Sequence, residues 1–293
     1  MKSLDGKVAV VTGGGGGIGA AMGEAFGRAG MKVVLADIQP EPLEKTVAVL
    51  QGDGLDVIGV PTDVTTWESV AALRDAALAA YGAVHVLCNN AGIGAGAEGP
   101  MWEHELRDWE WALAVNVWGV IHGINAFVPV MLGQDDEGHV VNTSSGNGGI
   151  SPLPSTPQYA ATKAAVVTLT ECLYAQLQDT GKPVSASVLF PGPHMLRTGL
   201  FESWRTRPAH FAKERPRQTP YVTVESLEEQ MKAAGVDVAY TEPSEVADMV
   251  VDGIRTNTFW IQAPTERTEE MVRARAESIL KSENPAYLRA VPG

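Results

Sequence analysis

Residues 7–19, KVAVVTGGGGGIG, decide the fold of this chain. Residues 7–12 form a short run rich in β-branched valine, which predicts a buried β-strand. The run passes directly into five consecutive glycines at 13–17. A helical pattern of small and apolar residues follows over 18–29, and Gly30 ends it. A strand, a glycine turn and a helix in immediate succession predict the first β–α unit of a parallel sheet.

The glycine turn also has a chemical use. Without side chains, its backbone can approach a pyrophosphate closely, and the N-terminus of the following helix offers N–H groups to the same anion. Five glycines in a row leave the register of the G-x-G-x-x-G spacing ambiguous. The flanking strand and helix nevertheless distinguish the turn from a flexible linker and indicate a dinucleotide site.

Asp37 follows the next predicted strand, 32–36. A carboxylate at this distance from the glycine turn accepts hydrogen bonds from the ribose hydroxyls of an adenosine. It also repels a 2′-phosphate, and no Arg or Lys stands in the glycine turn or directly after Asp37. We therefore expect NAD rather than NADP. The alternative for Asp37 is a turn or helix-cap residue.

Strand-like and helix-like segments alternate along the rest of the chain. Further short apolar runs predict strands at 57–60, 84–87, 139–143, 184–190 and 258–262. The helical patterns between them include a long one over 103–132 and another over 158–178. This alternation predicts an α/β fold, a Rossmann-like doubly wound parallel sheet of about seven strands with helices on both faces. The 293 residues are near the upper limit for one core, so we expect a single domain over 1–293.

The composition argues against several kinds of partner. The chain has 22 Lys and Arg against 35 Asp and Glu, a formal net charge of −13, so it repels nucleic acids and anionic membranes. We see no apolar run approaching the length of a membrane span and no cleavable signal pattern, so we expect a cytoplasmic protein. Cys88 and Cys172 lie among apolar neighbours and are expected to be buried thiols. No metal-ligand spacing is present, and no metal is expected.

Tyr159 and Lys163 are the first candidates for chemistry. Four positions separate them inside the predicted helix 158–178, so both side chains lie on one helix face. A phenol with a pKa of about 10 is a poor base at neutral pH, but a nearby ammonium lowers that pKa. The two residues could therefore form a proton-transfer unit. An isolated Y-x-x-x-K is usually only two exposed side chains, so the pair gains weight from its surroundings.

Polar residues also follow two other predicted strands, and one lies inside an apolar helical segment. Ser144 and Ser145 follow the predicted strand 139–143. Asn116 lies between apolar residues of the segment 103–132, where an amide needs hydrogen-bond partners, so it is either structural or part of the site. The segment 89–92, NNAG, ends another predicted strand at the sheet edge where ligands bind in open α/β folds; the alternative is a turn.

Taken in order, these motifs resemble the short-chain dehydrogenase/reductase family in its shorter single-domain form, over about residues 4–192 and the last helix–strand unit. The segment 12–19, TGGGGGIG, resembles the family's cofactor turn, and 90–92 its sheet-stabilising motif. The resemblance implies that NAD is held by Gly13, Gly16, Gly17, Ile18, Gly19, Asp37, Asp63, Val64, Asn90, Ala91, Gly92, Tyr159, Lys163, Pro191, Gly192 and Thr198.

The resemblance also implies a catalytic tetrad of Asn116, Ser145, Tyr159 and Lys163. Tyr159 would exchange a proton with the alcohol or carbonyl oxygen, and Ser145 would orient that oxygen. Lys163 would hold the ribose hydroxyls and lower the pKa of the tyrosine, and Asn116 would hold a water that links Lys163 to solvent.

Two departures from the family pattern bear on these assignments. The family usually places its serine thirteen residues before the tyrosine, whereas Ser145 is fourteen and Ser144 fifteen before it. The S-x-x-G pattern of 145–148 selects Ser145 and implies one extra residue in 152–157. The threonine that usually follows Pro191 and Gly192 at short range is displaced, and Thr198 is the nearest candidate.

Three functions remain open from the sequence. The first is an NAD-dependent alcohol dehydrogenase or ketone reductase, with an NADP-dependent carbonyl reductase as a variant. The second is a catalytically silent NAD-binding or sensing protein of the same fold, which would not need the whole tetrad. The third is epimerisation or dehydration, which the short length and the position of the last glycine in the turn disfavour. The family resemblance also implies a homodimer or homotetramer.

Residues 193–240, called the lid segment below, lose the α/β pattern and are expected to cover the substrate. The segment carries apolar residues enough to line a pocket. Together with the charged helix after Thr265, it resembles the branch of the family that oxidises bulky aryl, terpenoid or steroid-like secondary alcohols, so we expect a bulky hydrophobic secondary alcohol or ketone. The expected substrate contacts are Ser145, Asn147, Tyr159, His194 and Trp204. The lid segment also holds a cluster of six basic residues over 197–217, Arg197, Arg205, Arg207, Lys213, Arg215 and Arg217. We expect them to pair with acids; the alternative is an anionic substrate.

Overall fold

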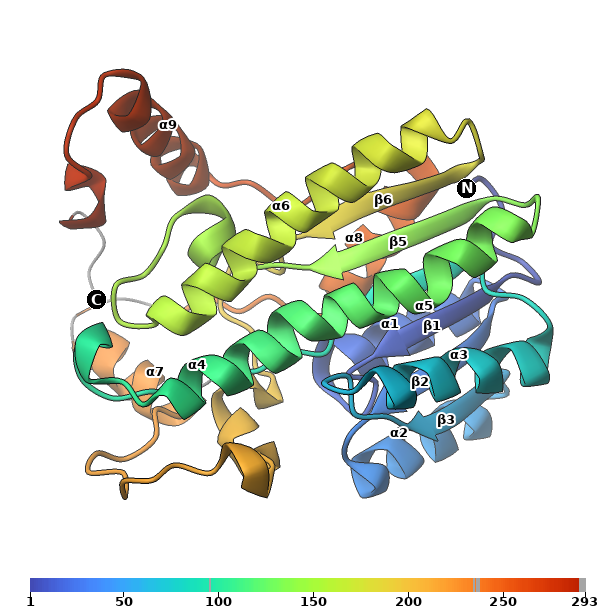
Figure 1. The fold of residues 1–293 in the computed structure, drawn as a ribbon, viewed down its shortest axis with the longest axis horizontal. Coiled ribbons are helices and arrows are strands. Elements are labelled where there is room, and N and C mark those ends of the chain that lie inside the picture. The colour runs from blue at the N-terminus through green and yellow to red at the C-terminus, as the bar shows by residue number, and fades with distance from the viewer. Residues whose placement is uncertain (95, 234, 236–237, 290–293) are drawn as a thin grey trace.

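A computed structural model of the chain describes residues 1–94, 96–233, 235 and 238–289 (Figure 1). The described residues form a seven-stranded sheet in the order β3-β2-β1-β4-β5-β6-β7, and all its neighbouring strands are parallel. The strands are β1 Val8–Thr12, β2 Lys32–Asp37, β3 Val57–Pro61, β4 Val86–Asn89, β5 Gly138–Thr143, β6 Val184–Leu189 and β7 Trp260–Ile261. The predicted Rossmann-like α/β fold is confirmed.

Helices cover both faces of the sheet because successive strand side chains point to opposite sides. Ala9 and Val11 face one core cluster, and Val10 between them faces the other. The first cluster is closed by α1 Gly17–Arg28, α2 Pro40–Gly52 and α8 Pro243–Thr256. The second is closed by α3 Trp67–Tyr81, α5 Gly119–Gly133 and α6 Pro157–Asp179, on the near side of Figure 1.

The strand order places the future site. From β1 the chain runs outward through β2 to β3, then returns to β4 beside β1 and runs the other way to β7. The connections after β1 and β4 therefore diverge, which opens a crevice at the carboxyl ends of these two strands. The glycine turn follows β1 and the segment 90–92 follows β4, so both motifs meet at this crevice.

The long predicted helix 103–132 is interrupted at Asn116. It consists of α4 Leu106–Leu113, a π-helical turn Ala114–Trp118 and α5. The stretch Leu106–Gly133 is long and apolar enough to cross a membrane, so the expectation that no run approaches that length is wrong for this stretch. Here it packs over the sheet, with Phe127 and Met131 in the core.

The lid segment carries short helices beside the carboxyl ends of the strands. They are η4 Gly199–Thr206, η5 Ala209–Phe211 and α7 Val224–Ala233, which lie near α4 in Figure 1. Besides the π-helical turn at 114–118, the described residues outside the lid segment include the short helical turns η1 Met101–Glu103, η3 Gly146–Ile150 and η6 Ala286–Arg289. The last long helix, α9 Glu266–Leu280, follows β7.

One expectation about the cysteines is also wrong. Cys88 lies buried in β4, as predicted, but Cys172 is exposed on α6. The apolar neighbours of Cys172 in sequence point into the core from the other side of the helix, and the periodicity of α6 places Cys172 on the outer face.

Candidate active site

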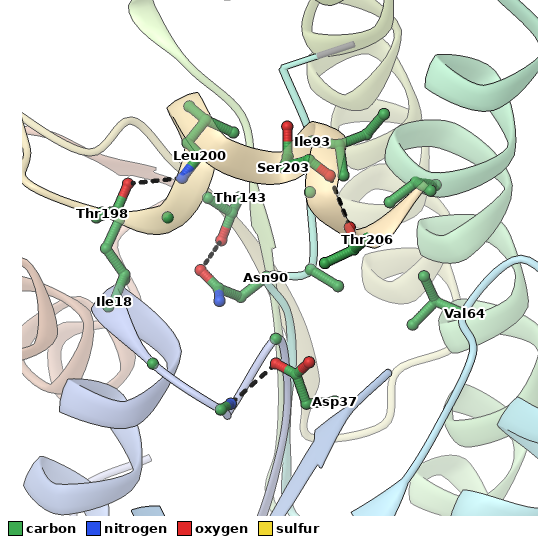
Figure 2. Close-up of a pocket in the computed structure, with 18 of the residues that line it drawn as sticks. Ile18, Asp37, Val64, Asn90, Ile93, Thr143, Thr198, Leu200, Ser203 and Thr206 are labelled. Atoms are coloured by element: carbon green, nitrogen blue, oxygen red, sulfur yellow. Dashed lines mark hydrogen bonds between the residues drawn. The ribbon is translucent and has the colours of Figure 1, made fainter. Parts of the chain in front are cut away.

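A cavity of about 710 Å³ runs along the carboxyl edge of the sheet, from the glycine turn to the lid segment. Figure 2 shows η4 crossing it over Thr143 and Asn90, with Asp37 toward the opposite end. A volume of this size is within the usual range for a cofactor or substrate site. The residues that line it come from both predicted groups, the dinucleotide-binding residues and the catalytic ones.

Two hydrogen bonds join the glycine turn to the end of β2, one to its backbone and one to a side chain. The amide of Gly14 donates to the carbonyl of Ala36 at 2.9 Å, and the amide of Gly15 donates to Oδ2 of Asp37 at 2.9 Å. No Cβ fits at Gly14, since it would lie 2.8 Å from the Cβ of Leu35. Gly16 faces open space, and no side chain caps α1 at its first residue, Gly17. The bare helix N-terminus and the exposed backbone suit a pyrophosphate.

Asp37 and Asp63 lie on the cavity wall at the ends of β2 and β3. Oδ1 of Asp37 accepts from the amide of Gln39 at 3.0 Å, so the carboxylate closes a local turn as well as facing the cavity. It does not cap α2 by its side chain. Oδ1 of Asp63 accepts from the amide and the hydroxyl of Thr65, at 2.9 and 2.7 Å. Both carboxylates are thereby fixed in orientation beside the cavity.

Asn90 ties together the ends of three strands. Its amide and that of Ala91 donate to the hydroxyl of Thr12 at 3.0 and 3.1 Å, and its Nδ2 donates to the carbonyl of Thr12 at 3.1 Å. Its Oδ1 accepts from the hydroxyl of Thr143 at 3.4 Å (Figure 2). The segment 90–92 therefore holds β1, β4 and β5 in register at the cavity floor.

Lys163 is buried, with 3% of its surface exposed, and its Nζ donates to the carbonyl of Thr143 at 2.9 Å. Burial lowers the pKa of this ammonium to about 8. The Nζ lies 5.6 Å from the centre of the Tyr159 ring, one helical turn away. A Cβ added at Gly92 would lie 3.3 Å from the same nitrogen, so glycine leaves the ammonium its room.

Asn116 does not line the cavity. Its side-chain amide is hydrogen-bonded to other residues of the site. Its Oδ1 accepts from the amide of Ile93 at 2.8 Å, and its Nδ2 donates to the carbonyl of Ile93 and the hydroxyl of Thr162, both at 3.0 Å. The π-helical turn directs the amide of Asn116 at the loop after β4. Asn116 thus joins the π-turn, that loop and α6 next to Lys163.

Tyr159 and Ser145 both line the cavity. Burial raises the pKa of Tyr159, and a hydrogen bond with Ser145 opposes that rise. The expectation that Lys163 lowers this pKa is therefore wrong for the protein alone, where burial outweighs the other effects. Ser144 differs from Ser145: it is 1% exposed, and its hydroxyl donates to the carbonyl of Lys163 at 2.7 Å.

Two expected substrate residues are used elsewhere. Asn147 fixes the loop before α6: its Nδ2 donates to the hydroxyl of Thr156 at 2.7 Å, and its Oδ1 accepts from the amide of Leu153 at 2.9 Å. Trp204 stacks on Tyr221 within the lid segment, with ring centres 4.4 Å apart. Neither lines the cavity, whereas His194 does.

Of the other residues expected to bind the cofactor, some line the cavity and others do not. Thr198 lines the cavity, and a Cβ added at Gly17 would lie 3.3 Å from its side chain, so it lies against the glycine turn. Gly13, Ile18, Val64 and Pro191 also line it. Gly19 and Gly192 do not. A Cβ added at Gly19 would lie 2.0 Å from the carbonyl of Gly13, so this glycine allows helix and turn to pack.

Sequence reasoning missed several wall residues. They come from the glycine turn, the loop after β4, α4 and its π-turn, the end of β5, the loop before α6 and the lid segment: Gly15, Ile93, Trp111, Val115, Thr143, Leu153, Ser203, Thr206 and Pro208. The glycine run signalled Gly15. The apolar residues of the lid segment that were expected to line a pocket include Met195, Leu196, Leu200 and Phe201, and all four line the cavity.

The sequence profile described as short chain dehydrogenase matches residues 7–209, which include both the glycine turn and the Tyr159–Lys163 pair. The chain belongs to the short-chain dehydrogenase family. Its members are oxidoreductases, so the class of chemistry expected from the sequence is confirmed at that level.

Individual relatives of this short-chain dehydrogenase differ in what they bind. The C alpha-dehydrogenase of Sphingobium sp. (strain NBRC 103272 / SYK-6) is 31% identical over 285 residues, 97% of this chain and 89% of the relative. A crystal structure of a short chain dehydrogenase/reductase from Burkholderia phymatum in complex with NAD is 41% identical, with a TM-score of 0.86 over 97% of this chain and 98% of that one. A metagenomic short-chain oxidoreductase in complex with NADP is 27% identical, with a TM-score of 0.65 over 86% and 91%.

The pKa of Lys163 in this short-chain dehydrogenase predicts a pH-dependent stability. The folded protein loses the Lys163 proton near pH 8, but the unfolded chain keeps it up to about the ordinary pKa of 10.5. Between these values the unfolded state binds more protons, so raising the pH stabilises the fold. We expect the free energy of unfolding of the wild type to rise, relative to that of Lys163→Met, from pH 8 upward. The rise is complete once the unfolded chain has also lost the Lys163 proton, and it then amounts to about 3 kcal/mol.

Denaturant unfolding of the cofactor-free proteins between pH 7 and 10 measures this difference. Lys182→Met is the matched control, since Lys182 is exposed and pairs with Asp135. A wild-type advantage over Lys163→Met that does not change across this range would show that burial does not depress the pKa of Lys163.

Proposed function

We propose that this protein is an NAD-dependent dehydrogenase or ketone reductase that interconverts a bulky hydrophobic secondary alcohol and its ketone. The observation that carries the proposal is the single cavity lined by Asp37, Ser145, Tyr159 and Lys163. A nucleotide-binding end and a proton-transfer end are thereby joined in one space. A protein that only senses NAD has no need for the second end.

The residues present fit a nicotinamide dinucleotide. Gly15, Gly16 and the N-terminus of α1 would receive the pyrophosphate, Asp37 the adenosine ribose and Lys163 the other ribose. When bound, the nicotinamide supplies the hydride acceptor or donor. The chain itself has to orient the substrate oxygen, move its proton and exclude water.

Two side chains would handle the substrate oxygen, and a third would assist one of them. Ser145 has a hydroxyl on the cavity wall and would donate to that oxygen. Tyr159 would exchange the proton. Because burial raises its pKa, the phenol stays protonated at neutral pH and is ready to donate to a carbonyl in the reductive direction. In the oxidative direction the tyrosine has to act as a base, which the Lys163 ammonium would assist.

Asn116 would act in the site's framework instead of on the reactants. Its amide already makes three hydrogen bonds, so it would hold the loop after β4 and the start of α6 in place. This differs from the expected role of carrying a water to Lys163. Through that framework Asn116 would keep Lys163 within reach of the ribose.

The preference for NAD rests on Asp37. Its carboxylate faces the cavity beside the glycine turn, where a 2′-phosphate would meet a like charge. The NAD-bound structure similar to this chain agrees, whereas an NADP-bound relative keeps the NADP-dependent carbonyl reductase as the competing assignment.

The proposed substrate size rests on the wall opposite the sheet. Ile93, Trp111, Val115, Leu200 and Phe201 all line the cavity. They give the cavity that Tyr159 also lines an apolar surface larger than a small alcohol requires. The six basic residues clustered over 197–217 in the lid segment all have carboxylate partners, which removes the main reason to propose an anionic substrate. The homodimer or homotetramer and the cytoplasmic location remain predictions of the sequence.

We expect Tyr159→Phe to lower kcat by about 10²- to 10⁴-fold, because it removes the proposed proton donor. Binding of NADH, followed by its fluorescence, should be nearly unchanged. Tyr174→Phe is the matched control, since Tyr174 lies on the same helix and packs against Phe259. The assay follows the absorbance of reduced nicotinamide over a panel of bulky ketones and secondary alcohols. A Tyr159→Phe enzyme with near-normal turnover would disprove the mechanism.

We expect the wild type to prefer NAD and Asp37→Ala to shift the NAD-to-NADP ratio of kcat/KM toward NADP. The expected shift is about tenfold or more, equivalent to about 1.4 kcal/mol of lost discrimination. Asp53→Ala is the control, because it removes an exposed carboxylate that pairs with Arg28 outside the cavity. A wild type that prefers NADP would overturn the cofactor assignment, and an unchanged ratio in Asp37→Ala would overturn only the role of Asp37.

A further inference from the structure

Asp108 is a carboxylate buried between the body of the protein and the lid segment. It stands in the first turn of α4 and is 1% exposed. Its Oδ1 lies 2.6 Å from Nη1 of Arg207, and its Oδ2 lies 3.4 Å from Nζ of Lys213. Both cations belong to the lid segment. One buried anion therefore holds the lid segment at two points.

Arg207 connects this anion to the cavity wall. Its Nε donates to the carbonyl of Phe211 at 2.7 Å, which fixes the turn of the lid segment that follows it. Its guanidinium lies 5.0 Å from the centre of the Trp111 ring, within the range of a cation–π contact. The two neighbours of Arg207 in sequence, Thr206 and Pro208, line the cavity, as does Trp111.

Asp108 and Trp111 are three residues apart on α4, so they share one face of the helix. The carboxylate that binds the lid segment thus stands one turn from the indole that forms the opposing wall. Phe211 packs in the same apolar cluster as Trp111 and Ile93. These contacts set the separation between α4 and the lid segment. That separation in turn determines the width of the cavity.

The other ion pairs of the lid segment are less suited to this task. Arg197–Glu228 and Arg205–Glu202 are pairs within the segment, with arginine side chains 64% and 60% exposed. Arg215 pairs with Glu105 on the body but is 66% exposed. Arg217 is 15% exposed and pairs with Glu98 on the body, but this pair is long, 3.9 Å, and Arg217 lies over the ring of Tyr221 instead of Trp111. Exposed pairs are screened by solvent and contribute little. Removing one partner of a buried pair instead leaves an uncompensated charge, so the contact between the two parts is lost.

We propose that Asp108 is a positioning residue that sets substrate specificity by fixing the lid segment, through Arg207 and Lys213, against Trp111. The inference rests on the proposed function, since it concerns the substrate end of the same cavity. Asp108 touches neither the reacting atoms nor the nucleotide-binding end. Its effect is to keep the apolar wall at a fixed distance, so that a large hydrophobic substrate gains contacts on both sides.

The test uses Asp108→Asn, which keeps the size of the side chain and removes the charge that both cations share. Hydrogen exchange of peptides covering 199–213 reports the lid segment without any need for turnover. We expect faster exchange there in Asp108→Asn. With 1,2-diphenylethanone as the bulky probe, we expect KM to rise by about 10- to 100-fold. For acetone as the small probe, KM and kcat should change by less than about threefold, and NADH affinity should stay the same.

Arg207→Met is the second variant, because Asp108 then keeps Lys213 as its counter-ion and the protein is expected to fold. It should show the same exchange pattern and, for the bulky ketone, the same rise in KM. Glu202→Gln is the matched control, since it removes one charge from the same segment without touching the body. We expect it to behave as the wild type does.

Unchanged exchange over 199–213 in both Asp108→Asn and Arg207→Met would overturn the inference, whatever the enzyme's activity. Equal losses for the bulky and the small ketone would also overturn it, because they would indicate a general structural role. Absence of turnover by the wild type on any alcohol or ketone would instead contradict the proposed function, while the exchange measurement would still decide the role of Asp108.

Discussion

The ammonium of Lys163 has to find its hydrogen-bond partners inside the protein, because only 3% of the residue is exposed. It donates to the carbonyl of Thr143, the last residue of β5, and so fixes α6 against the carboxyl end of that strand. The hydroxyl of Ser144 supports the same junction from the other side by donating to the carbonyl of Lys163. The position of Tyr159, one turn earlier on α6, follows from these two bonds. The cavity edge is built around this junction, and the lid segment closes over it.

Much of this arrangement could be predicted because it depends on local pattern. The valine-rich run before the glycine turn predicted β1, and the glycines predicted a turn without side chains at the nucleotide end. The spacing of Tyr159 and Lys163 placed both on one face of α6, and both line the cavity. These features need only the periodicity of strands and helices and the sterics of glycine. The family comparison agrees with them at the level of fold and reaction class.

Features that depend on distant contacts could not be predicted in the same way. The π-helical turn at Asn116 has no local signal beyond an amide in an apolar stretch, and the role of that amide depends on Ile93 and Thr162. Trp204 looked like a substrate contact, but it stacks on Tyr221 within the lid segment. The direction of the Tyr159 pKa was also missed, because the desolvation of a buried phenol cannot be judged from its spacing to a lysine. Sequence pattern identified the groups, and tertiary packing determined how each is used.

The central claim is that the buried polar groups at this edge divide into those that hold the fold and those left for the substrate. Ser144 and Ser145 are adjacent in sequence and both line the cavity. The hydroxyl proton of Ser144 is given to the carbonyl of Lys163, whereas the hydroxyl of Ser145 accepts from the amide of Asn147 at 3.2 Å and can still donate its own proton to the substrate. The most direct measurement compares kcat and the free energy of unfolding for Ser144→Ala and Ser145→Ala. The account predicts that Ser145→Ala loses about 10²-fold or more in kcat, a loss far larger than the roughly 1 kcal/mol of stability that goes with its hydrogen bond from the amide of Asn147. It predicts that Ser144→Ala loses about 1 kcal/mol of stability and keeps most of its turnover. The reverse pattern, with Ser144→Ala inactive and Ser145→Ala merely less stable, would contradict it.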